Sequence, residues 1–164
     1  MAVPRIPHEP TARERQGLLR AARSIAIVGF SPNTARSSYY VATYLTQDTD
    51  YRLYFINPNA AGREVLGHTV HASLGDLPET PDIVDVFRRA SDLPAVVEEV
   101  VALGSPAVWF QLGLTNDEAA GAARAAGATV VQNRCLKIEH ARFHGGLHLA
   151  GFDTGVISAR KTQR

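Results

Sequence analysis

The chain has 164 residues, which suits one domain with a sizeable core, and its 45% hydrophobic and 20% charged content is typical of a globular protein. Its 17 Lys and Arg against 16 Asp and Glu give a formal net charge of +1 without a polybasic run, so the composition indicates neither nucleic acid nor an anionic membrane as a partner. The single cysteine, Cys135, excludes an intrachain disulfide, and no apolar run approaches the roughly 18 residues of a membrane span. The first ten residues also lack the apolar region of a signal peptide, so we expect a cytoplasmic protein.

The chain is expected to begin with an irregular arm followed by a short helix. Residues 1–11 contain three prolines, which favour irregular structure. Thr11 and Glu14 have the spacing of a capping box, in which each residue's side chain accepts a hydrogen bond from the other's backbone N–H. This pair predicts a helix that ends near Ala22 and leads into the first strand.

Residues 24–40 are the stretch on which the functional interpretation depends. Residues 25–28 are a continuous apolar run, as expected for a strand buried on both faces. A turn-rich loop over 29–36 follows, and from Ser37 an amphipathic pattern predicts a helix to about Gln47. A buried strand, a loop of small residues and a helix start together bring backbone N–H groups toward an anion. We therefore expect this loop to bind a ligand; the alternative is an ordinary connecting loop.

The second predicted strand, residues 51–56, ends at Asn57 and Pro58. In nicotinamide-binding proteins an acidic residue in this place holds the ribose hydroxyl groups. Here the first carboxylate after the strand is Glu64, and the loop after residue 28 has one glycine where the G-x-G-x-x-G fingerprint has three. Both departures disfavour NAD.

Strand and helix patterns alternate along the rest of the chain. The pattern predicts an edge strand and a turn within 65–74, buried strands at 83–87, 107–110 and 128–131, and helices at 92–103, 117–126 and 136–143. The expected N-caps are Ser91 and either Thr115 or Asn116, and Gly104 and Gly127 are the expected helix ends. This alternation predicts an α/β fold with a doubly wound, Rossmann-like parallel sheet of about five or six strands. The single domain would span residues 12–141, between the arm at 1–11 and a C-terminal tail at 142–164 in which 147–157 has an extended pattern.

Polar or cationic residues follow nearly every predicted strand. The strand ends carry Gly29-Phe30-Ser31, Asn57-Pro58, Phe87-Arg88-Arg89, Gln111-Leu112-Gly113 and Asn133-Arg134-Cys135. The carboxyl ends of parallel strands meet at one edge of a sheet, and ligands bind there at the point where the strand order reverses. These ends therefore predict a binding crevice.

The same residues resemble those of a known family. The motifs, in order, are Ile-Ala-Ile-Val-Gly-Phe-Ser (25–31), Ile-Asn-Pro (56–58), Gly67, Asp-Ile-Val-Asp-Val-Phe-Arg (82–88), Trp-Phe-Gln-Leu-Gly (109–113), Ala-Ala-Gly (125–127) and Asn-Arg-Cys (133–135). This series is similar to the small, stand-alone CoA-binding proteins, which are related to the first domain of the succinyl-CoA synthetase α subunit and to ADP-forming acyl-CoA synthetases. The resemblance covers about residues 12–141.

The resemblance implies coenzyme A or an acyl-CoA as the ligand. It implies a diphosphate near Gly29, Ser31, Asn33, Arg36 and Ser37, with the adenosine near Asn57 and Pro58. It also implies that Phe87 and Arg88 line the crevice, that Gln111 and Gly113 lie toward the pantetheine, and that Phe30, Asn133 and Cys135 adjoin the site. Relatives often carry a basic residue where this chain has Asn59, which leaves Arg63 as the candidate for the 3′-phosphate.

Cys135 has two possible roles, and the histidines could be metal ligands or packing residues. A neighbouring arginine and a helix start both favour a thiolate, so one hypothesis is that Cys135 lies near the CoA thiol and forms a mixed disulfide with it; the alternative is a packed structural cysteine. His140, His144 and His148 recur every four residues, but two glycines interrupt them, so we expect packing histidines and no metal site. Asp82 precedes the predicted strand at 83–87 and Asp85 lies within it, but no acid/base partner stands at a matched spacing, and no catalytic residue is predicted.

The favoured interpretation is a CoA-binding carrier, sensor or accessory subunit without chemistry of its own. The alternative is a component of a CoA-dependent ligase or transferase that needs a partner chain, and an NAD-dependent oxidoreductase is a third, weaker reading. A homodimer and an unidentified partner protein both remain open.

Overall fold

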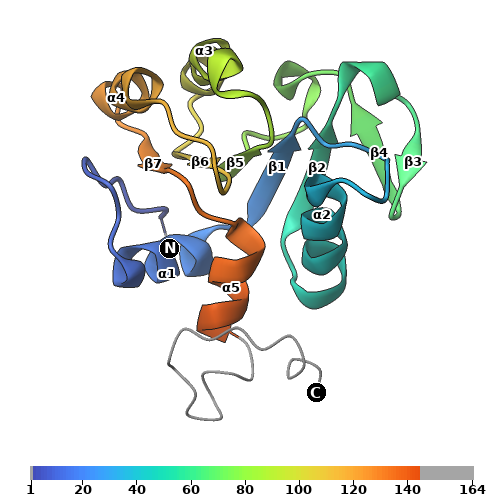
Figure 1. Ribbon diagram of the computed structural model, residues 1–164, viewed down its shortest axis with the longest axis horizontal. Helices are drawn as coiled ribbons and strands as arrows, with labels where there is room; N and C mark the ends of the chain where they lie inside the picture. Colours follow the sequence, from blue (N-terminus) through green and yellow to red (C-terminus); the bar gives the residue numbers. More distant parts are fainter. Residues whose placement is uncertain (1, 145–164) are drawn as a thin grey trace.

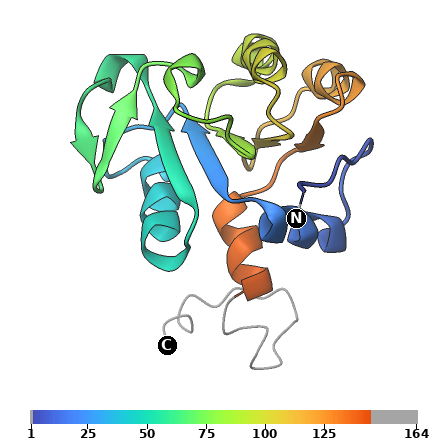
Figure 2. The same ribbon diagram turned by 180° about the vertical axis from the view of Figure 1, so that it is seen from behind.

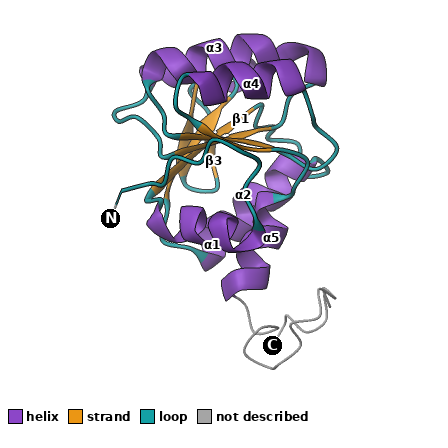
Figure 3. Cartoon of the chain, turned by 90° about the vertical axis from the view of Figure 1, so that its left-hand side faces the viewer, coloured by secondary structure: helices purple, strands orange, loops and turns teal. Residues whose placement is uncertain are grey.

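Seven strands form one sheet that lies between two layers of helices (Figures 1 and 3). The computed structural model describes residues 2–144. The strands are β1 (Ser24–Val28), β2 (Arg52–Ile56), β3 (Glu64–Val65), β4 (His68–His71), β5 (Ile83–Val86), β6 (Ala107–Phe110) and β7 (Thr129–Val131). The helices are α1 (Ala12–Ala21), α2 (Ser37–Asp48), α3 (Leu93–Leu103), α4 (Asp117–Ala125) and α5 (Leu136–His144), with short 3-10 turns η1 (Pro58–Ala60), η2 (Leu74–Asp76) and η3 (Ala90–Asp92).

The strand order is β3-β4-β2-β1-β5-β6-β7, and every pair except β3 with β4 is parallel. Counted without β3, the parallel strands follow the order 3-2-1-4-5-6 of doubly wound sheets, and the order reverses between β1 and β5. Figure 2 shows the β3–β4 end of the sheet opposite the β7 edge. The predicted doubly wound α/β fold is confirmed.

One part of the strand prediction was wrong. The single edge strand expected within 65–74 is two short strands, because Leu66 and Gly67 adopt φ values of 53° and 81° and turn the chain back between β3 and β4. β4 is the sixth parallel strand, and the two-residue β3 pairs with it antiparallel at the edge. The expected five or six strands therefore become seven.

The central strands owe their continuous apolar sequences to burial on both faces. Every residue of β1, β5, β6 and β7 is buried. Ile25, Ile27 and Trp109 belong to the core beside α1, α2 and α5, whereas Val84 and Phe110 belong to the core beside α3 and α4 (Figure 3). A strand with helices on both sides has no polar face, so its sequence does not alternate.

Most helix ends lie where the sequence indicates. Thr11 and Glu14 form the predicted capping box, Asn116 caps α4 through its side chain, and Gly104 ends α3 with φ 80°. The prediction for the start of α3 was wrong. Ser91 lies within the 3-10 turn η3, and Asp92 occupies the N-cap position one residue later, without a side-chain hydrogen bond to the helix.

Hydrogen bonds to distant elements hold both ends of the described chain on the domain. The Ile6 N–H donates to Thr129 Oγ1 at 2.8 Å, which holds the N-terminal arm along the β7 edge. Arg15 of α1 donates through Nε to Glu139 Oε1 of α5 at 2.6 Å, and both side chains are almost fully buried. The predicted extended stretch at 147–157 and His148 lie outside the described residues. Among residues 2–144, none of the helices combines the length and apolar character that crossing a bilayer requires.

Candidate functional site

The site is organised around Gly29, where the loop after β1 passes the end of β5. Gly29 has φ 82°, and a Cβ added there would lie 2.2 Å from the Phe87 carbonyl oxygen. The Gly29 N–H donates to the Ile56 carbonyl at 3.1 Å, and the Phe87 N–H donates to the Val28 carbonyl at 2.8 Å. Only glycine allows this approach without displacing backbone. The three strand ends thus meet at the point where the sheet reverses.

Small polar side chains fix the loop between Gly29 and α2. Ser38 Oγ accepts from the Ser31 N–H at 2.9 Å, and Ser31 Oγ accepts from the Asn33 N–H at 3.1 Å. Asn33 Oδ1 in turn accepts from the Ala35 N–H at 2.9 Å. Arg36 occupies the N-cap position of α2, and no side chain caps the helix. The Tyr39 N–H donates to the Arg36 carbonyl at 3.0 Å. The Ser37 and Ser38 N–H groups, with the positive end of the helix dipole, have no acceptor among residues 2–144 and are open to an external one.

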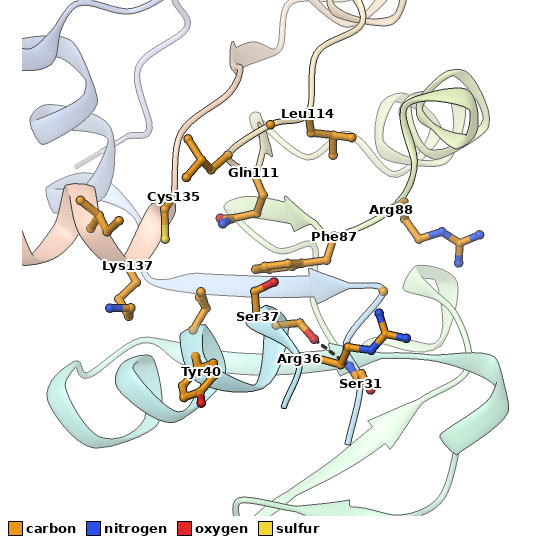
Figure 4. Close-up of a pocket in the computed structure, with 16 residues that line it drawn as sticks. Ser31, Arg36, Ser37, Tyr40, Phe87, Arg88, Gln111, Leu114, Cys135 and Lys137 are labelled. Atoms are coloured by element: carbon orange, nitrogen blue, oxygen red, sulfur yellow. Dashed lines mark hydrogen bonds between the residues drawn. The ribbon is translucent and has the colours of Figure 1, made fainter. Parts of the chain in front are cut away.

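A cavity of about 530 Å³ opens between this loop, the ends of β5 and β6, and the start of α5 (Figure 4). Its volume is within the roughly 300–1,000 Å³ of small-molecule sites. Nine of the predicted site residues line it: Gly29, Ser31, Arg36, Ser37, Phe87, Arg88, Gln111, Gly113 and Cys135. Within the described part of the chain, its charged lining residues are Arg36, Arg88 and Lys137, and none of its lining residues is a carboxylate. The cavity therefore favours an anionic ligand.

The two ends of the cavity differ in chemistry. In Figure 4, Arg36 and Ser31 lie at one end, and Cys135 and Lys137 lie at the other, with Phe87 and Gln111 between them. The cationic end contains the open N-terminus of α2, and the other end contains the only thiol of the chain. The arrangement suits an elongated ligand that is anionic at one end.

A second cavity, of about 430 Å³, lies on the other side of the β1 and β5 ends. Gly29 and Arg88 line both cavities. The second cavity has apolar walls from Ile56, Leu74 and Val96, and its carboxylates are Asp92, Glu98 and Glu99. Arg88 donates to Asp92 Oδ2 from Nη2 at 3.2 Å. The pKa of Asp92 lies below its usual value, because the charges of Arg88 and Arg89 outweigh the desolvation that acts to raise it.

The other five predicted site residues lie outside the first cavity. Phe30 is fully buried and stacks on Phe55 with a centroid distance of 4.3 Å, and Asn33 is used within its own loop. Asn57 donates through Nδ2 to the Phe30 carbonyl at 2.8 Å and accepts from the Asn59 N–H, so its amide ties the ends of β1 and β2 together.

The last two of these residues, Pro58 and Asn133, lie at the second cavity and behind the first. Pro58 lines the second cavity. Asn133, with φ 60°, accepts from the Gly113 N–H at 2.6 Å and supports the cavity wall from behind.

Several lining residues were not predicted from the sequence. They are Ser38, Tyr40, Val41, Leu112, Leu114, Lys137 and Ile138. Tyr40 and Leu112 are 61% and 66% exposed, which is unusual for large apolar side chains. Tyr40 follows a predicted helix start and Leu112 follows a predicted strand end, so the sequence could have indicated that both lie at the crevice. Lys137 and Ile138 had no such indication, because the packing of α5 beside the crevice is a tertiary feature.

Asp85 is the most unusual ionisable group near the site. It lies inside β5, opposite Ile27 of β1 and Trp109 of β6, as expected from its position within the predicted strand at 83–87. The residue is 0% exposed, and neither carboxylate oxygen has a hydrogen-bond partner within residues 2–144. Burial raises the pKa of the Asp85 carboxyl well above its usual range. Because side chains alternate along a strand, Asp85 lies on the same face of the sheet as Phe87. Phe87 lines the first cavity, and Asp85 lies two residues earlier along the chain, away from it.

His140 and Trp109 serve packing. His140 is buried, and its Nδ1 lies 2.8 Å from the Tyr44 hydroxyl, with both Tyr44 and Tyr51 at its ring edge. Burial, followed by the nearby Asp48 charge, raises the pKa of Tyr44 to about 12. Trp109 is fully buried and donates to the Arg134 carbonyl at 2.8 Å, which confirms its predicted place in the core.

A doubly wound parallel sheet with a crevice at its reversal point defines the class of Rossmann-like domains. Residues 23–141 match the model of the CoA binding domain, and the chain belongs to this CoA-binding family. The sequence-based assignment to the family is therefore confirmed.

Relatives match over nearly their whole length. The uncharacterized protein YneT of Bacillus subtilis (strain 168) is 36% identical over 132 residues, which cover 80% of this chain and 96% of YneT. A solved structure from Thermus thermophilus is 39% identical with a TM-score of 0.77, over 82% of this chain and 99% of that chain. A hypothetical protein from Pyrococcus horikoshii OT3 is 33% identical with a TM-score of 0.78, over 88% and 99%.

A more distant likeness concerns the fold alone. The apo form of the dinucleotide-forming acetyl-coenzyme A synthetase 1 of Ca. Korarchaeum cryptofilum is 18% identical with a TM-score of 0.58. The match covers 66% of this chain and 25% of the synthetase chain. The same Rossmann-like arrangement thus occurs as one part of a larger enzyme.

Proposed function

We propose that the chain binds coenzyme A or an acyl-CoA in the crevice at the carboxyl ends of the parallel strands, as a carrier, a sensor or an accessory subunit without chemistry of its own. The observation that carries this proposal is the first cavity, which has a cationic end at the α2 N-terminus, a thiol at the other end and no carboxylate in its wall. Family membership supports the same ligand.

The diphosphate belongs at the cationic end. Its oxygens would accept from the open N–H groups of the first turn of α2 and from the Arg36 guanidinium. Arg88 can serve the same group because it lines this cavity as well as the second one. An Arg88 that turns to the ligand would leave Asp92, with which it pairs in the structure.

The pantetheine arm would then run through the first cavity, and the adenosine would lie toward the second. The arm passes the Phe87 ring and the Gln111 amide and ends near Cys135 and Lys137. The second cavity begins at the shared Gly29 and includes Pro58, so it is where the adenosine would extend. Its apolar walls suit a planar base.

The end of β2 supports CoA over NAD. Asn57 uses its amide oxygen and nitrogen within the protein, and the first carboxylate after β2 is Glu64, so the end of this strand lacks the acidic residue that holds the ribose hydroxyls of a nicotinamide dinucleotide. Among residues 2–144, the lining of the first cavity contains no His, Asp or Glu that could act as a base for the Cys135 thiol. This lining supports the proposed binding role.

Isothermal titration calorimetry of the full chain with CoA, acetyl-CoA, NAD and ATP tests the proposal. We expect CoA and acetyl-CoA to bind more tightly than NAD and ATP. Arg36→Ala should weaken CoA binding by roughly 10- to 100-fold, since a hydrogen bond to a charged group contributes about 1.5–3 kcal/mol.

Arg89→Ala is the matched control. Arg89 follows Arg88 directly, its side chain is 83% exposed, and it lines neither cavity. Its removal changes the net charge by the same amount and should leave the affinity within about twofold, because an exposed charge is screened. Binding of NAD without CoA, or an equal loss in both arginine variants, would refute the proposal. Turnover that appears only when a second protein chain is added would favour the ligase or transferase alternative.

A further inference from the structure

Cys135 occupies a wall of the first cavity at the start of α5. The Glu139 N–H donates to the Cys135 carbonyl at 3.0 Å, which is the first hydrogen bond of the helix, so Cys135 stands at its N-terminal end. The side chain is partly exposed and not disulfide-bonded. Figure 4 shows its sulfur at the end of the cavity away from Arg36, on the same side as Lys137. The thiol therefore borders the cavity and is open to a molecule that enters it.

Gln111 provides a second and independent indication of a ligand at this place. Its residue is 7% exposed, and Oε1 accepts from the Leu136 N–H at 3.0 Å, which fixes the orientation of the amide. The Nε2 group has no partner among residues 2–144. Figure 4 shows this amide in the cavity, between Cys135 and Phe87. The Gln111 residue is more than nine-tenths buried, and its free amide N–H faces the cavity, so it is available to an acceptor on a ligand. An amide carbonyl of a pantetheine arm is such an acceptor.

We infer that Cys135 is a covalent capture site for the thiol end of the bound ligand, reached by exchange with a CoA disulfide. The inference rests on the proposed function, because it takes CoA as the occupant of the crevice. In the reaction the Cys135 thiolate attacks one sulfur of CoA–S–S–CoA. The Cys135–CoA disulfide forms, the CoA–CoA disulfide breaks, and the leaving CoA thiolate takes up the proton that Cys135 gave up. One disulfide replaces another, so no further oxidant is needed.

The arrangement makes the exchange selective for disulfides that carry the nucleotide. The diphosphate held at the α2 N-terminus and the Gln111 donor on the arm would place the attacked sulfur next to Cys135. Positioning of this kind raises the effective concentration of the reacting groups. A disulfide that lacks the nucleotide, such as glutathione disulfide, cannot bind at the α2 N-terminus, so nothing holds its sulfur atoms next to the Cys135 thiol. The captured state would report the ratio of CoA disulfide to CoA around the protein.

Intact-mass spectrometry of the reduced full chain incubated with CoA disulfide tests the inference. We expect one adduct with the mass of CoA less two hydrogen atoms, and none in Cys135→Ser, because the chain has a single cysteine. Glutathione disulfide at the same concentration should react at least about tenfold more slowly. Arg36→Ala should slow capture from CoA disulfide about tenfold or more, and Gln111→Glu, which keeps the acceptor for Leu136 and removes the free donor, should slow it as well. Arg89→Ala should not.

The outcomes separate this inference from the proposed function. If CoA binds in calorimetry and the reduced chain forms no adduct, the inference is wrong and the proposed function stands. Equal rates with CoA disulfide and glutathione disulfide would also overturn the inference, because they would mean an ordinary surface thiol. If CoA does not bind at all, the proposed function itself fails.

Discussion

Replacement of Asp85 by asparagine should make the protein respond differently to pH. A carboxyl in an unfolded chain has a pKa of about 3.9, whereas burial raises the folded pKa of Asp85 well above that value. The unfolded chain therefore releases this proton at lower pH than the folded chain does. The stability that depends on the protonated group is complete below about pH 4 and is lost as the pH rises toward the folded pKa, by about 1.4 kcal/mol for each pH unit.

Asp85→Asn removes this dependence. Its unfolding free energy relative to the parent protein should therefore rise by about 1.4 kcal/mol per pH unit from about pH 4 to the folded pKa and then stay constant. The buried amide of the variant also lacks partners, which shifts the difference in unfolding free energy between variant and parent by an amount that does not depend on pH. The slope of this difference against pH is therefore the quantity to measure. Asp85→Leu should show the same slope with a more favourable offset, because Ile27 and Trp109 beside it are apolar.

Urea denaturation between about pH 4.5 and 8, followed by the fluorescence of Trp109 and by circular dichroism, provides the measurement. Trp109 is the only tryptophan and is fully buried, so it reports unfolding of the sheet. The difference between variant and parent isolates Asp85, because all other ionisable groups are common to both. Parallel stability profiles for the parent and both variants would refute the reasoning.

Three further changes test the packing around the site, each by the urea unfolding free energy. Gly29→Ala should lower the unfolding free energy by at least about 2 kcal/mol and remove CoA binding, because its Cβ would lie 2.2 Å from the Phe87 carbonyl oxygen at a positive φ. An unchanged unfolding free energy would mean that the strand ends do not meet this closely. Glu139→Gln should cost about 3–5 kcal/mol, since it leaves the buried Arg15 charge unpaired, and a loss below about 1 kcal/mol would show that water reaches the pair. Thr11→Ala should cost about 1 kcal/mol through loss of the capping box at α1, and no change would mean that this helix end is frayed in solution.

The elements of the fold were predictable because their causes are local. The apolar runs of the central strands, the Thr11 capping box and the left-handed Gly104 each act within a few residues of the chain. The division of the edge into β3 and β4 was missed because it depends on Leu66 in a positive-φ conformation, which leucine rarely adopts. The N-cap position of α3 is Asp92 and not Ser91, a difference of one residue. Both residue types favour the N-cap position, so the sequence did not decide between them.

The site was predictable in its location and less so in its side chains. The strand-end rule predicted Arg88 and Gln111 at one crevice, and the resemblance to CoA-binding proteins added Arg36; all three line the first cavity. Asn57 has a polar side chain at the right strand end, but its amide serves the protein itself, and the sequence cannot show how a hydrogen bond is used. Lys137 reaches the cavity only through the packing of α5, which no local pattern encodes.

A crystal structure of the full chain grown with CoA tests whether CoA occupies the crevice with its diphosphate at the start of α2. We expect diphosphate density within hydrogen-bond distance of Arg36 and of the first-turn N–H groups of α2, with the pantetheine arm passing Gln111 toward Cys135. Density for CoA on another face, or a diphosphate far from Arg36, would contradict this expectation.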